Sequence, residues 1–438
     1  MISKEEYQAR RQRLSALMPA GCLAIIPGNT LSVRNNDAHY RFRQDSDFYY
    51  LTGFEEPDAV LVLEAGKNAQ SYLFNLPRDM AKEQWNGRRL GQERAADVLG
   101  ISRAFSIEVF SQELQALMAD KKSIYWSIGR YPDIDRICWQ SVQALKEKVR
   151  RGVVAPETFV DVSPMIAEMR LFKSEAELAL MRKAASISVE AHKSAMRECS
   201  SVHYEYELEA VLTYAFAKNG CRAPAYDPIV GGGANTCILH YTENNQPLKA
   251  GDLVLIDAGG EFQNYAADIT RTFPVNGRFS EAQRLIYELV LKAQRAGIAT
   301  VKPGVFWHEI QAVMVNIITE GLCALGILKG NVAELVEQEA YKPFYMHNSG
   351  HWLGLDVHDA GQYKFNNEWR ALEPGMVLTV EPGIYIAEGV SSDKRWWNIG
   401  IRIEDDIAVT KNGHENLTGA LPVEIDEIEA LICGKASS

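Results

Sequence analysis

LKAGDLVLIDAGG (residues 248–260) and LEPGMVLTVEPGI (residues 372–384) share one pattern, and this repetition decides how the second half of the chain is interpreted. The second copy begins 124 residues after the first, which aligns Asp257 with Glu381. In each copy an acidic residue follows a short apolar strand. Chance similarity between two such strands is common, whereas a duplicated half-domain would bring both acids to a shared centre.

A second acid follows the first copy closely. Asp268 lies eleven residues after Asp257, beyond the turn-rich segment AGGEFQNYAA. This spacing predicts an antiparallel hairpin with its turn near Gln263 and Asn264, in which the two carboxylates oppose each other about 5 Å apart. Two carboxylates at that distance repel unless a cation lies between them. The alternative is that Asp268 is a solvated turn residue.

The segment NIGIRIEDD (residues 398–406) alternates between apolar and polar positions. A strand with this period places Arg402 and Glu404 on the same face. An ion pair on an exposed edge strand is one interpretation. The presence of Glu381 at the end of another strand favours a shared acidic centre instead.

Three of the nine histidines, His347, His351 and His358, lie within twelve positions of one another. The glycines among them argue against a regular helix. Single histidines are usually structural, but three near four strand-borne acids favour a metal or catalytic site. The candidate ligands are four carboxylates and one imidazole: Asp257, Asp268, His351, Glu381 and Glu404.

The charge of these ligands balances two divalent cations. Oxygen-rich ligation with a single nitrogen suits Mn²⁺, with Co²⁺, Fe²⁺ and Zn²⁺ as competitors. Bridging carboxylates would hold the ions roughly 3.5–4 Å apart, the spacing at which both share one hydroxide nucleophile. Such a centre is typical of hydrolases, and from the residues alone a two-metal phosphoesterase would also fit.

Size and composition limit the remaining possibilities. A chain of 438 residues exceeds what one core usually organises, so two domains are expected. The net charge of −11, without a Lys/Arg block, argues against nucleic acid as a partner. The chain shows neither a signal-peptide core nor an apolar run of spanning length, which predicts a cytoplasmic protein without a membrane partner. Seven cysteines without a CxxC spacing indicate reduced thiols, mostly buried.

Periodicity divides the chain near Phe172 into a mixed α/β domain (residues 1–172) and a second domain (residues 173–438), an α+β organisation. In the first domain we expect strands at 22–28, 47–54, 59–66, 71–75 and 122–128, and helices at 3–18, 92–100, 111–119 and 141–149. In the second, helices are expected at 174–198, 205–219, 280–300 and 307–325.

Together these motifs make the sequence similar to the metallopeptidases of the pita-bread fold, most closely to the bacterial aminopeptidase P (Xaa-Pro aminopeptidase) family. The resemblance spans nearly the whole chain. Besides the two repeated segments it includes YRFRQDSDFYYLTGFEEPDAVLVL (40–63), WNGRRLG (85–91), EMRLFKS (168–174), ILHYTEN (238–244), DITRTFPVNG (268–277), HWLGLDVHD (351–359) and GIRIEDD (400–406).

The resemblance implies a duplicated pita-bread catalytic domain preceded by a domain for substrate access and oligomerisation. It also implies roles for individual residues. Asp268 and Glu404 would bridge two metals, Asp257 would serve one of them, and His351 and Glu381 would complete the second site. The remaining site residues would be catalytic His240 and His358, the orienting Arg402, and substrate contacts from Tyr226, His347 and Trp85. The resemblance implies that Trp85 reaches across a subunit interface.

By the same resemblance, the expected reaction is removal of the first residue from peptides with proline in second position. A shared hydroxide would attack the scissile carbonyl, with Glu381 relaying a proton and His358 steadying the oxyanion. Proline lacks an N–H and imposes a fixed kink, so a pocket with few acceptors and apolar walls would favour it. Assembly as a homodimer or homotetramer is expected.

Three other functions remain to be separated from this one. A prolidase uses the same metal ligands but cuts only Xaa-Pro dipeptides. A methionine aminopeptidase normally lacks a large N-terminal domain. A non-catalytic pita-bread module that binds peptides or proteins would typically have lost ligands, whereas all five are present here.

One departure from the family pattern lies beside a ligand. The family usually reads His-Gly-aliphatic-Ser/Gly-His where this chain has His347, Asn348, Ser349, Gly350 and His351. We expect the polar Asn348 and Ser349 to alter the local pocket shape and to leave the ligand in place.

Overall fold

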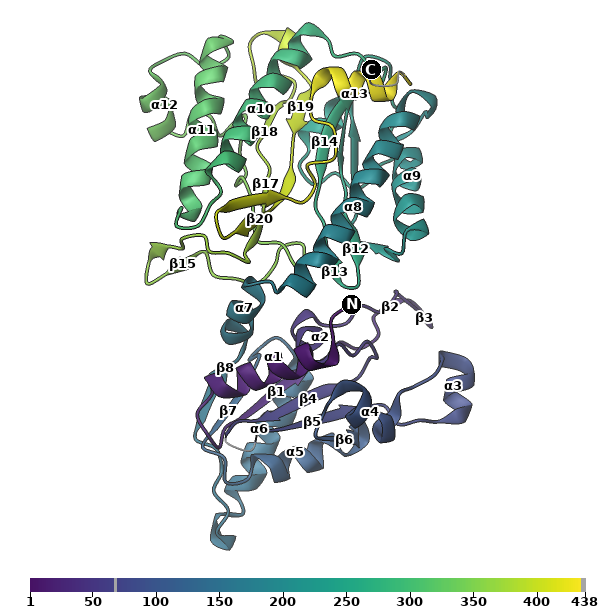
Figure 1. Ribbon diagram of the computed structural model, residues 1–438, viewed down its shortest axis with the longest axis vertical. Helices are drawn as coiled ribbons and strands as arrows, with labels where there is room; N and C mark the ends of the chain where they lie inside the picture. The colour runs from purple at the N-terminus through teal and green to yellow at the C-terminus, as the bar shows by residue number, and fades with distance from the viewer. Residues whose placement is uncertain (67–68, 435–438) are drawn as a thin grey trace. The chain divides into compact units, whose positions relative to one another are not determined.

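The structure is a computed structural model that describes residues 1–66 and 69–434 (Figure 1). The chain divides into two compact units, Met1–Arg170 and Leu171–Ser438, called unit 1 and unit 2 below. Each unit has a hydrophobic core of its own. The candidate ligands all belong to unit 2.

Unit 1 is built on a six-stranded mixed sheet in the order β6-β5-β4-β1-β7-β8. The strands β1, β4 and β5 pair antiparallel, while β5–β6, β1–β7 and β7–β8 are parallel. Their bounds are β1 (Leu23–Pro27), β4 (Val60–Glu64), β5 (Gln70–Asn75), β6 (Arg103–Ser106), β7 (Ser123–Trp126) and β8 (Thr158–Asp161), with the small hairpin β2 (Val33–Asn35) and β3 (Ala38–His39) apart from them.

The helices of unit 1 include those predicted at 3–18, 92–100 and 111–119, while the helix predicted at 141–149 overlaps only the last turns of a longer one, Pro132–Lys146. They are α1 (Lys4–Leu17), α2 (Ser46–Thr52), α3 (Met80–Asn86), α4 (Gly91–Leu99), α5 (Phe110–Met118), α6 (Pro132–Lys146) and α7 (Ser163–Leu171). Helix α7 was not predicted from the sequence, because it contains Pro164 and its apolar residues follow the helical period only weakly. Proline in the first turn is tolerated since the N–H it lacks has no helical partner there.

The strand predicted at 47–54 is wrong, because these residues form helix α2. The Asp45 side chain accepts a hydrogen bond from the Phe48 N–H (2.9 Å) and caps the helix start, and Gly53 ends it with a left-handed φ of 64°. Every residue of α2 is buried. A helix buried all round has no amphipathic period, so its short apolar run resembles a buried strand.

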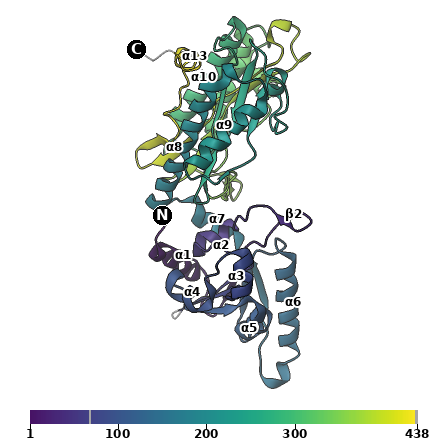
Figure 2. The same ribbon diagram turned by 90° about the vertical axis from the view of Figure 1, so that its right-hand side faces the viewer.

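Unit 2 consists of two similar halves, each a helix pair followed by a three-stranded antiparallel sheet. The helices α8 (Glu175–Glu198) and α9 (Glu205–Lys218) precede the sheet β10-β11-β14, and α10 (Glu281–Thr300) and α11 (Trp307–Ala324) precede the sheet β17-β20-β21. Helices α8 and α9, the pair of the first half, lie side by side (Figure 2). Helices α8 and α10 both begin with a capping box. The predicted fold class and duplication are confirmed.

The strands of unit 2 are short, and two of them carry the repeated pattern. Strand β11 (Leu253–Asp257) corresponds to β17 (Val377–Val380) under the 124-residue offset. The other elements are β9 (Ala223–Pro224), β10 (Ile229–Gly232), β12 (Gly260–Phe262), β13 (Tyr265–Ala266), β14 (Thr270–Pro274), β15 (Lys364–Phe365), β16 (Glu368–Trp369), β18 (Gly383–Ile386), β19 (Ile399–Arg402), β20 (Asp405–Thr410), β21 (Gly413–Asn416), α12 (Val332–Glu337) and α13 (Ile425–Ile432).

The core of unit 2 fixes which way the acids point. On β11, Val254 and Ile256 are buried in the main hydrophobic cluster, and on β17 Leu378 and Val380 join the same cluster. Because side chains alternate along a strand, Asp257 and Glu381, which directly follow Ile256 and Val380, face away from this core. The repeat thus places two acids on the same side.

Two further sequence expectations concern cysteines and membranes. All seven cysteines are free thiols, four of them buried, as predicted. Among residues 1–66 and 69–434, no helix is both long enough and apolar enough to cross a bilayer.

Candidate metal centre

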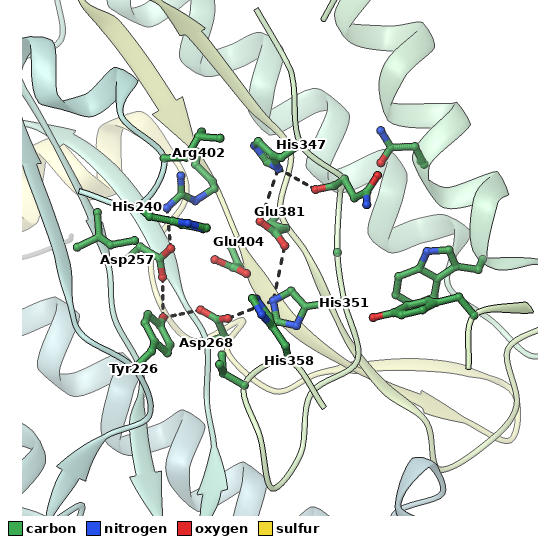
Figure 3. Close-up of a pocket in the computed structure, with 18 of the residues that line it drawn as sticks. Tyr226, His240, Asp257, Asp268, His347, His351, His358, Glu381, Arg402 and Glu404 are labelled. Carbon is green, nitrogen blue, oxygen red and sulfur yellow. Dashed lines mark hydrogen bonds and ion pairs between the residues drawn. The ribbon is translucent and has the colours of Figure 1, made fainter. Parts of the chain in front are cut away.

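Five predicted ligands come together from separate elements of unit 2 (Figure 3). Asp257 is the last residue of β11, Asp268 precedes β14 and Glu404 follows β19. Glu381 follows β17, and His351 lies on the irregular segment before that strand. All five line one cavity with a volume of about 890 Å³.

The donor atoms are close enough to bind metal. Single ligand atoms of Asp268, His351 and Glu404 all lie within 4.8 Å of one another. His351 Nε2 is 3.4 Å from Asp268 Oδ2 and 3.7 Å from Glu381 Oε1. Oxygen donors with one imidazole nitrogen form a set that suits a divalent transition metal, so the residues fit the metal that the sequence predicts.

The hairpin between the first two acids differs from the prediction in its register. Its turn lies at Gln263 and Asn264, both with positive φ, as expected. However, β11 and β14 pair Asp257 with Thr270, so Asp268 does not oppose Asp257 directly. A turn centred on Gln263 and Asn264 pairs Asp257 with Thr270, because these two positions lie equally far from the turn.

A glycine and a tyrosine then bring the two carboxylates together. A Cβ on Gly259 would lie 1.7 Å from the Ala267 carbonyl oxygen, so only glycine permits the close strand approach beside Asp268. The Tyr226 hydroxyl donates to Asp257 Oδ1 (2.6 Å) and also contacts Asp268 Oδ1. The alternative of Asp268 as a solvated turn residue is wrong, because its side chain is buried.

Arg402 is the buried cation of the site. Its guanidinium donates to Asp257 Oδ2 (2.6 Å), the Tyr385 hydroxyl (3.0 Å) and Thr270 Oγ1 (3.0 Å). Arg402 is 4% exposed and Glu404 is 2% exposed. A surface ion pair on an edge strand is therefore excluded, and Arg402 orients Asp257 as expected.

The acids have unequal proton affinities because their surroundings differ. Burial raises the pKa of Asp257, but Arg402 and the Tyr226 hydrogen bond outweigh it, so the net pKa is lowered. Burial and the charge of Asp257 raise the pKa of Asp268 to about 6. Burial raises the pKa of Glu381 to about 7, and burial with the neighbouring carboxylates raises that of Glu404 well above its usual range. This excess of buried negative charge is what cations would neutralise.

The histidines divide into one charged and two neutral members. Burial lowers the pKa of His351, but the hydrogen bond and charge of Asp268 outweigh it and raise the pKa to about 9. Burial and the charge of Arg402 lower the pKa of His347 to about 4. Burial and neighbouring imidazoles also lower the pKa of His358. Its ring packs edge-on against the His351 ring, with 4.3 Å between the ring centroids.

Every predicted site residue of unit 2 borders the cavity. Besides the ligands these are Tyr226, His240, His347, His358 and Arg402. Trp85 belongs to unit 1, where it lies on helix α3 and is 87% exposed, so it is not a core residue. Its contact with substrate stays a prediction.

Both units match known families. Residues 179–411 match the model of Metallopeptidase family M24, and residues 7–125 match that of Aminopeptidase P, N-terminal domain. The chain belongs to metallopeptidase family M24. As a member of M24, the chain is a metallopeptidase, and its acid cluster is the candidate metal-binding site.

Relatives within M24 match the chain over its length. It is 47% identical to a Xaa-Pro aminopeptidase of Escherichia coli (strain K12) and 46% identical to a Xaa-Pro aminopeptidase of Haemophilus influenzae, each over 98% of both chains. In structure it is similar to a Pseudomonas aeruginosa aminopeptidase PepP, with a TM-score of 0.96 and 47% identity over 99% of this chain and 98% of that chain. A zinc-substituted E. coli aminopeptidase P in complex with product matches with a TM-score of 0.97 and 46% identity over both whole chains.

Sequence reasoning missed several residues that support the M24 site. Tyr385 accepts a hydrogen bond from Arg402 and lies 2.8 Å from His347 Nε2, which connects the two. Thr270 Oγ1 donates to Glu404 Oε2 (2.7 Å). Both residues lie in ordinary strand patterns, so no local signal marks them.

The departure at Asn348 and Ser349 is accommodated within the M24 fold. The Ser349 side chain is buried, and its backbone N–H donates to Gln311 Oε1 (2.6 Å) while its hydroxyl contacts Gln311 and Tyr345. Asn348 and Gln311 both line the cavity. His351 keeps its place, and helix α11 is tied to the segment that carries it.

Proposed function

We propose that the chain is a two-metal aminopeptidase that releases the first residue from peptides with proline in second position. The observation that carries this proposal is the convergence of five ligands in a cavity that also holds four further histidines and Arg402. The Xaa-Pro aminopeptidases to which the chain is 46–47% identical over 98% of its length support the same substrate class.

In this proposal, Asp257, Asp268, His351, Glu381 and Glu404 hold two divalent ions, Mn²⁺ in preference to Co²⁺, Fe²⁺ or Zn²⁺. When bound, such ions supply a Lewis acid and lower the pKa of water so that a nucleophile forms at neutral pH. The protein provides the negative charges of the ligand carboxylates and shields the ions from solvent. Arg402 and Tyr226 hold Asp257 in one orientation, which fixes the geometry of the ligands.

The remaining side chains handle protons and substrate charge. Glu381 Oε1 lies 3.7 Å from His351 Nε2, and in this proposal the Glu381 carboxylate relays a proton during the reaction. His358 has a lowered pKa, so it is neutral and donates one N–H to the oxygen of the scissile carbonyl as charge develops there. His240 and His347 contact the peptide from other parts of the wall.

Proline selection follows from what the cavity wall offers. Ile229, Leu239 and Val357 supply apolar surface to the cavity. A proline ring buries apolar area against such a wall and has no N–H that needs an acceptor. Peptides with another residue in second position would bury an unsatisfied N–H, which costs about 1–3 kcal/mol.

A peptide panel tests the proposal directly. The full-length protein is stripped of metal, reloaded with Mn²⁺, and offered Ala-Pro-Ala, Ala-Ala-Ala and the dipeptide Ala-Pro. We expect Mn²⁺-dependent release of alanine from Ala-Pro-Ala and little from Ala-Ala-Ala. Cleavage of Ala-Pro alone would show a prolidase, and a folded protein that binds no transition metal would show a non-catalytic module.

Two proposals rest on the resemblance to aminopeptidase P. They are assembly as a homodimer or homotetramer and contact of Trp85 with substrate; the cytoplasmic location expected from the sequence stays a prediction. Sedimentation analysis tests the first. For the second, Trp85→Ala should raise KM for Ala-Pro-Ala, while the neighbouring exposed Met80→Ala should not.

A further inference from the structure

The catalytic cavity has a second part that the proposed chemistry does not use. Beyond the metal ligands it is lined by Trp307, His308, Tyr363 and Trp369, a group called the aromatic arm below. These residues come from the start of helix α11, the strand β16, and the segment that precedes the hairpin β15–β16. None of them was predicted as a site residue.

Contacts with the ligand segment hold the inner end of the arm in place. The Trp307 ring lies 4.4 Å from Trp352 and 4.6 Å from Tyr363, measured between ring centroids. The Tyr363 hydroxyl accepts a hydrogen bond from the Trp352 N–H (3.1 Å), and Trp352 directly follows the ligand His351. The Gln311–Ser349 contacts tie the next turn of α11 to the same segment.

The outer end of the arm is open. Trp369 is 36% exposed, and its ring stacks on His308 with 5.5 Å between centroids. This pair is not part of the main hydrophobic cluster of unit 2. Lys364 Nζ lies 4.2 Å from the centroid of the Trp369 ring, and the rings of the aromatic arm border the cavity as a prearranged aromatic surface.

The order of groups along the cavity indicates which part of a peptide reaches the arm. Asp257 and Tyr226 lie on one side of Asp268 and Glu404, and His351 with Glu381 lies on the other (Figure 3). We take the first residue to lie at the Asp257 side, where Tyr226, Ile229 and Leu239 border the cavity. The chain beyond the scissile bond then passes His351 and meets the aromatic arm.

We propose that the aromatic arm is a binding subsite for an aromatic side chain at the third position of the substrate, directly after proline. The inference rests on the proposed aminopeptidase function and extends it to substrate choice. The arm is continuous with the catalytic cavity, and a cavity of about 890 Å³ lies near the upper end of the range for drug-sized ligands, which leaves room beyond an Xaa-Pro dipeptide.

An aromatic ring is the occupant that the arm fits best. Its walls are indole, phenol and imidazole rings, which pair with another ring in edge-to-face or offset stacking. The polar groups at the arm are the His308 ring, the Gln311 amide, the Tyr363 hydroxyl that is bonded to the Trp352 N–H, and the Lys364 ammonium beside Trp369. Burial of a phenylalanine ring there corresponds to at least about a tenfold gain in kcat/KM over alanine.

The test uses the Mn²⁺-loaded full-length protein and three tetrapeptides. We expect Ala-Pro-Phe-Ala to be cleaved at least about ten times more efficiently, by kcat/KM, than Ala-Pro-Ala-Ala. Phe-Pro-Ala-Ala should show no comparable gain. If no peptide with proline in second position is cleaved, the proposed function fails; if all three are cleaved with equal efficiency, only the aromatic arm proposal fails.

Variants assign the preference to the arm. In Trp369→Ala and in His308→Ala, the ratio of kcat/KM for Ala-Pro-Phe-Ala to that for Ala-Pro-Ala-Ala should fall to about one to three. Phe365→Ala is the matched control, because Phe365 is an exposed aromatic on the same hairpin (46% exposed) and does not line the cavity. A ratio that both arm variants preserve, or a preference for phenylalanine at the first position, would overturn the proposal.

Discussion

Tyr385 connects the buried cation of the site to a neutral histidine. Its hydroxyl accepts from Arg402 Nη1 (3.0 Å) and lies 2.8 Å from His347 Nε2. Tyr385→Phe removes the hydroxyl and leaves buried polar groups with one partner fewer, so we expect the free energy of unfolding to fall by about 1–3 kcal/mol. Chemical denaturation of the metal-free protein measures it.

A surface tyrosine provides the comparison. Tyr214 on helix α9 is 66% exposed, so Tyr214→Phe should change the free energy of unfolding by less than about 0.5 kcal/mol. Equal stability of the Tyr385→Phe and Tyr214→Phe proteins would show that the connection contributes nothing to stability.

The protons held by the ligands predict how metal binding depends on pH. The metal-free folded protein has pKa values of about 6 for Asp268, about 7 for Glu381 and about 9 for His351, all above their ordinary values near 4 and 6.5. Between about pH 4 and pH 9 these three groups thus hold more protons in the folded protein than in the unfolded chain. Their contribution to stability without metal should fall as the pH rises through this window, whereas the lowered pKa of His347 acts in the opposite direction between about pH 4 and pH 6.5.

Metal displaces these protons, so its affinity should rise with pH by at least about tenfold per unit between pH 6 and pH 8. Added Mn²⁺ should also raise Tm more at pH 8 than at pH 6. Titration calorimetry in buffers with different ionisation enthalpies gives both the affinity and the number of protons released. A metal affinity that does not change with pH would show that metal binding does not displace protons from these ligands.

Single residues differ in how far the sequence alone reveals them. Asp257 and Glu381 could be found because the repeat and the strand period are local, and the core then fixes their direction. Tyr385 and Gln311 could not be found, since each acts through partners that are distant in sequence. The register of Asp268 was predicted wrongly although the turn was predicted correctly, because a turn at Gln263 and Asn264 pairs Asp257 with Thr270 and not with Asp268.

At the scale of elements, a buried ion pair joins the start of helix α8 to the loop that carries His358. Lys173 Nζ donates to Asp359 Oδ2 (2.9 Å), and both side chains are almost fully buried. Lys173→Met should lower the free energy of unfolding by up to about 3–5 kcal/mol. Because Asp359 directly follows His358, we also expect kcat for Ala-Pro-Ala to fall more than KM rises.

An exposed lysine on the same helix serves as control. Lys183→Met should leave both stability and kinetics close to those of the parent protein. The double variant Lys173→Met/Asp359→Leu removes both charges and should regain part of the lost stability. If Lys173→Met lowers stability while kcat stays unchanged, the ion pair does not position His358.

Elements with local signals were predicted well, and those defined by tertiary contacts were not. Two capping boxes mark the starts of α8 and α10 in the sequence, formed by Ser174 with Glu177 and by Ser280 with Gln283. Helix α2 was taken for a strand because burial on all sides removes the helical period. The hairpin β15–β16, which supplies Trp369 to the aromatic arm, is only two residues long on each strand and carries little pattern.

For the whole molecule, the division into two units separates metal binding from the first 170 residues. All five ligands and the whole cavity lining belong to unit 2, while unit 1 has a sheet and core of its own. A ligand stabilises only the folded part that binds it, by about 2.7 kcal/mol at a concentration 100 times its Kd. Metal should therefore act on unit 2 and leave the unfolding of unit 1 unchanged.

Scanning calorimetry of the full-length protein tests this expectation at pH 8. We expect two unfolding transitions in the metal-free protein, of which only one moves to higher temperature as Mn²⁺ is added. His351→Ala, which removes one ligand, should reduce that shift strongly and leave the other transition in place. A single transition that moves as a whole would mean that the two units unfold cooperatively, so that metal bound in unit 2 also stabilises unit 1.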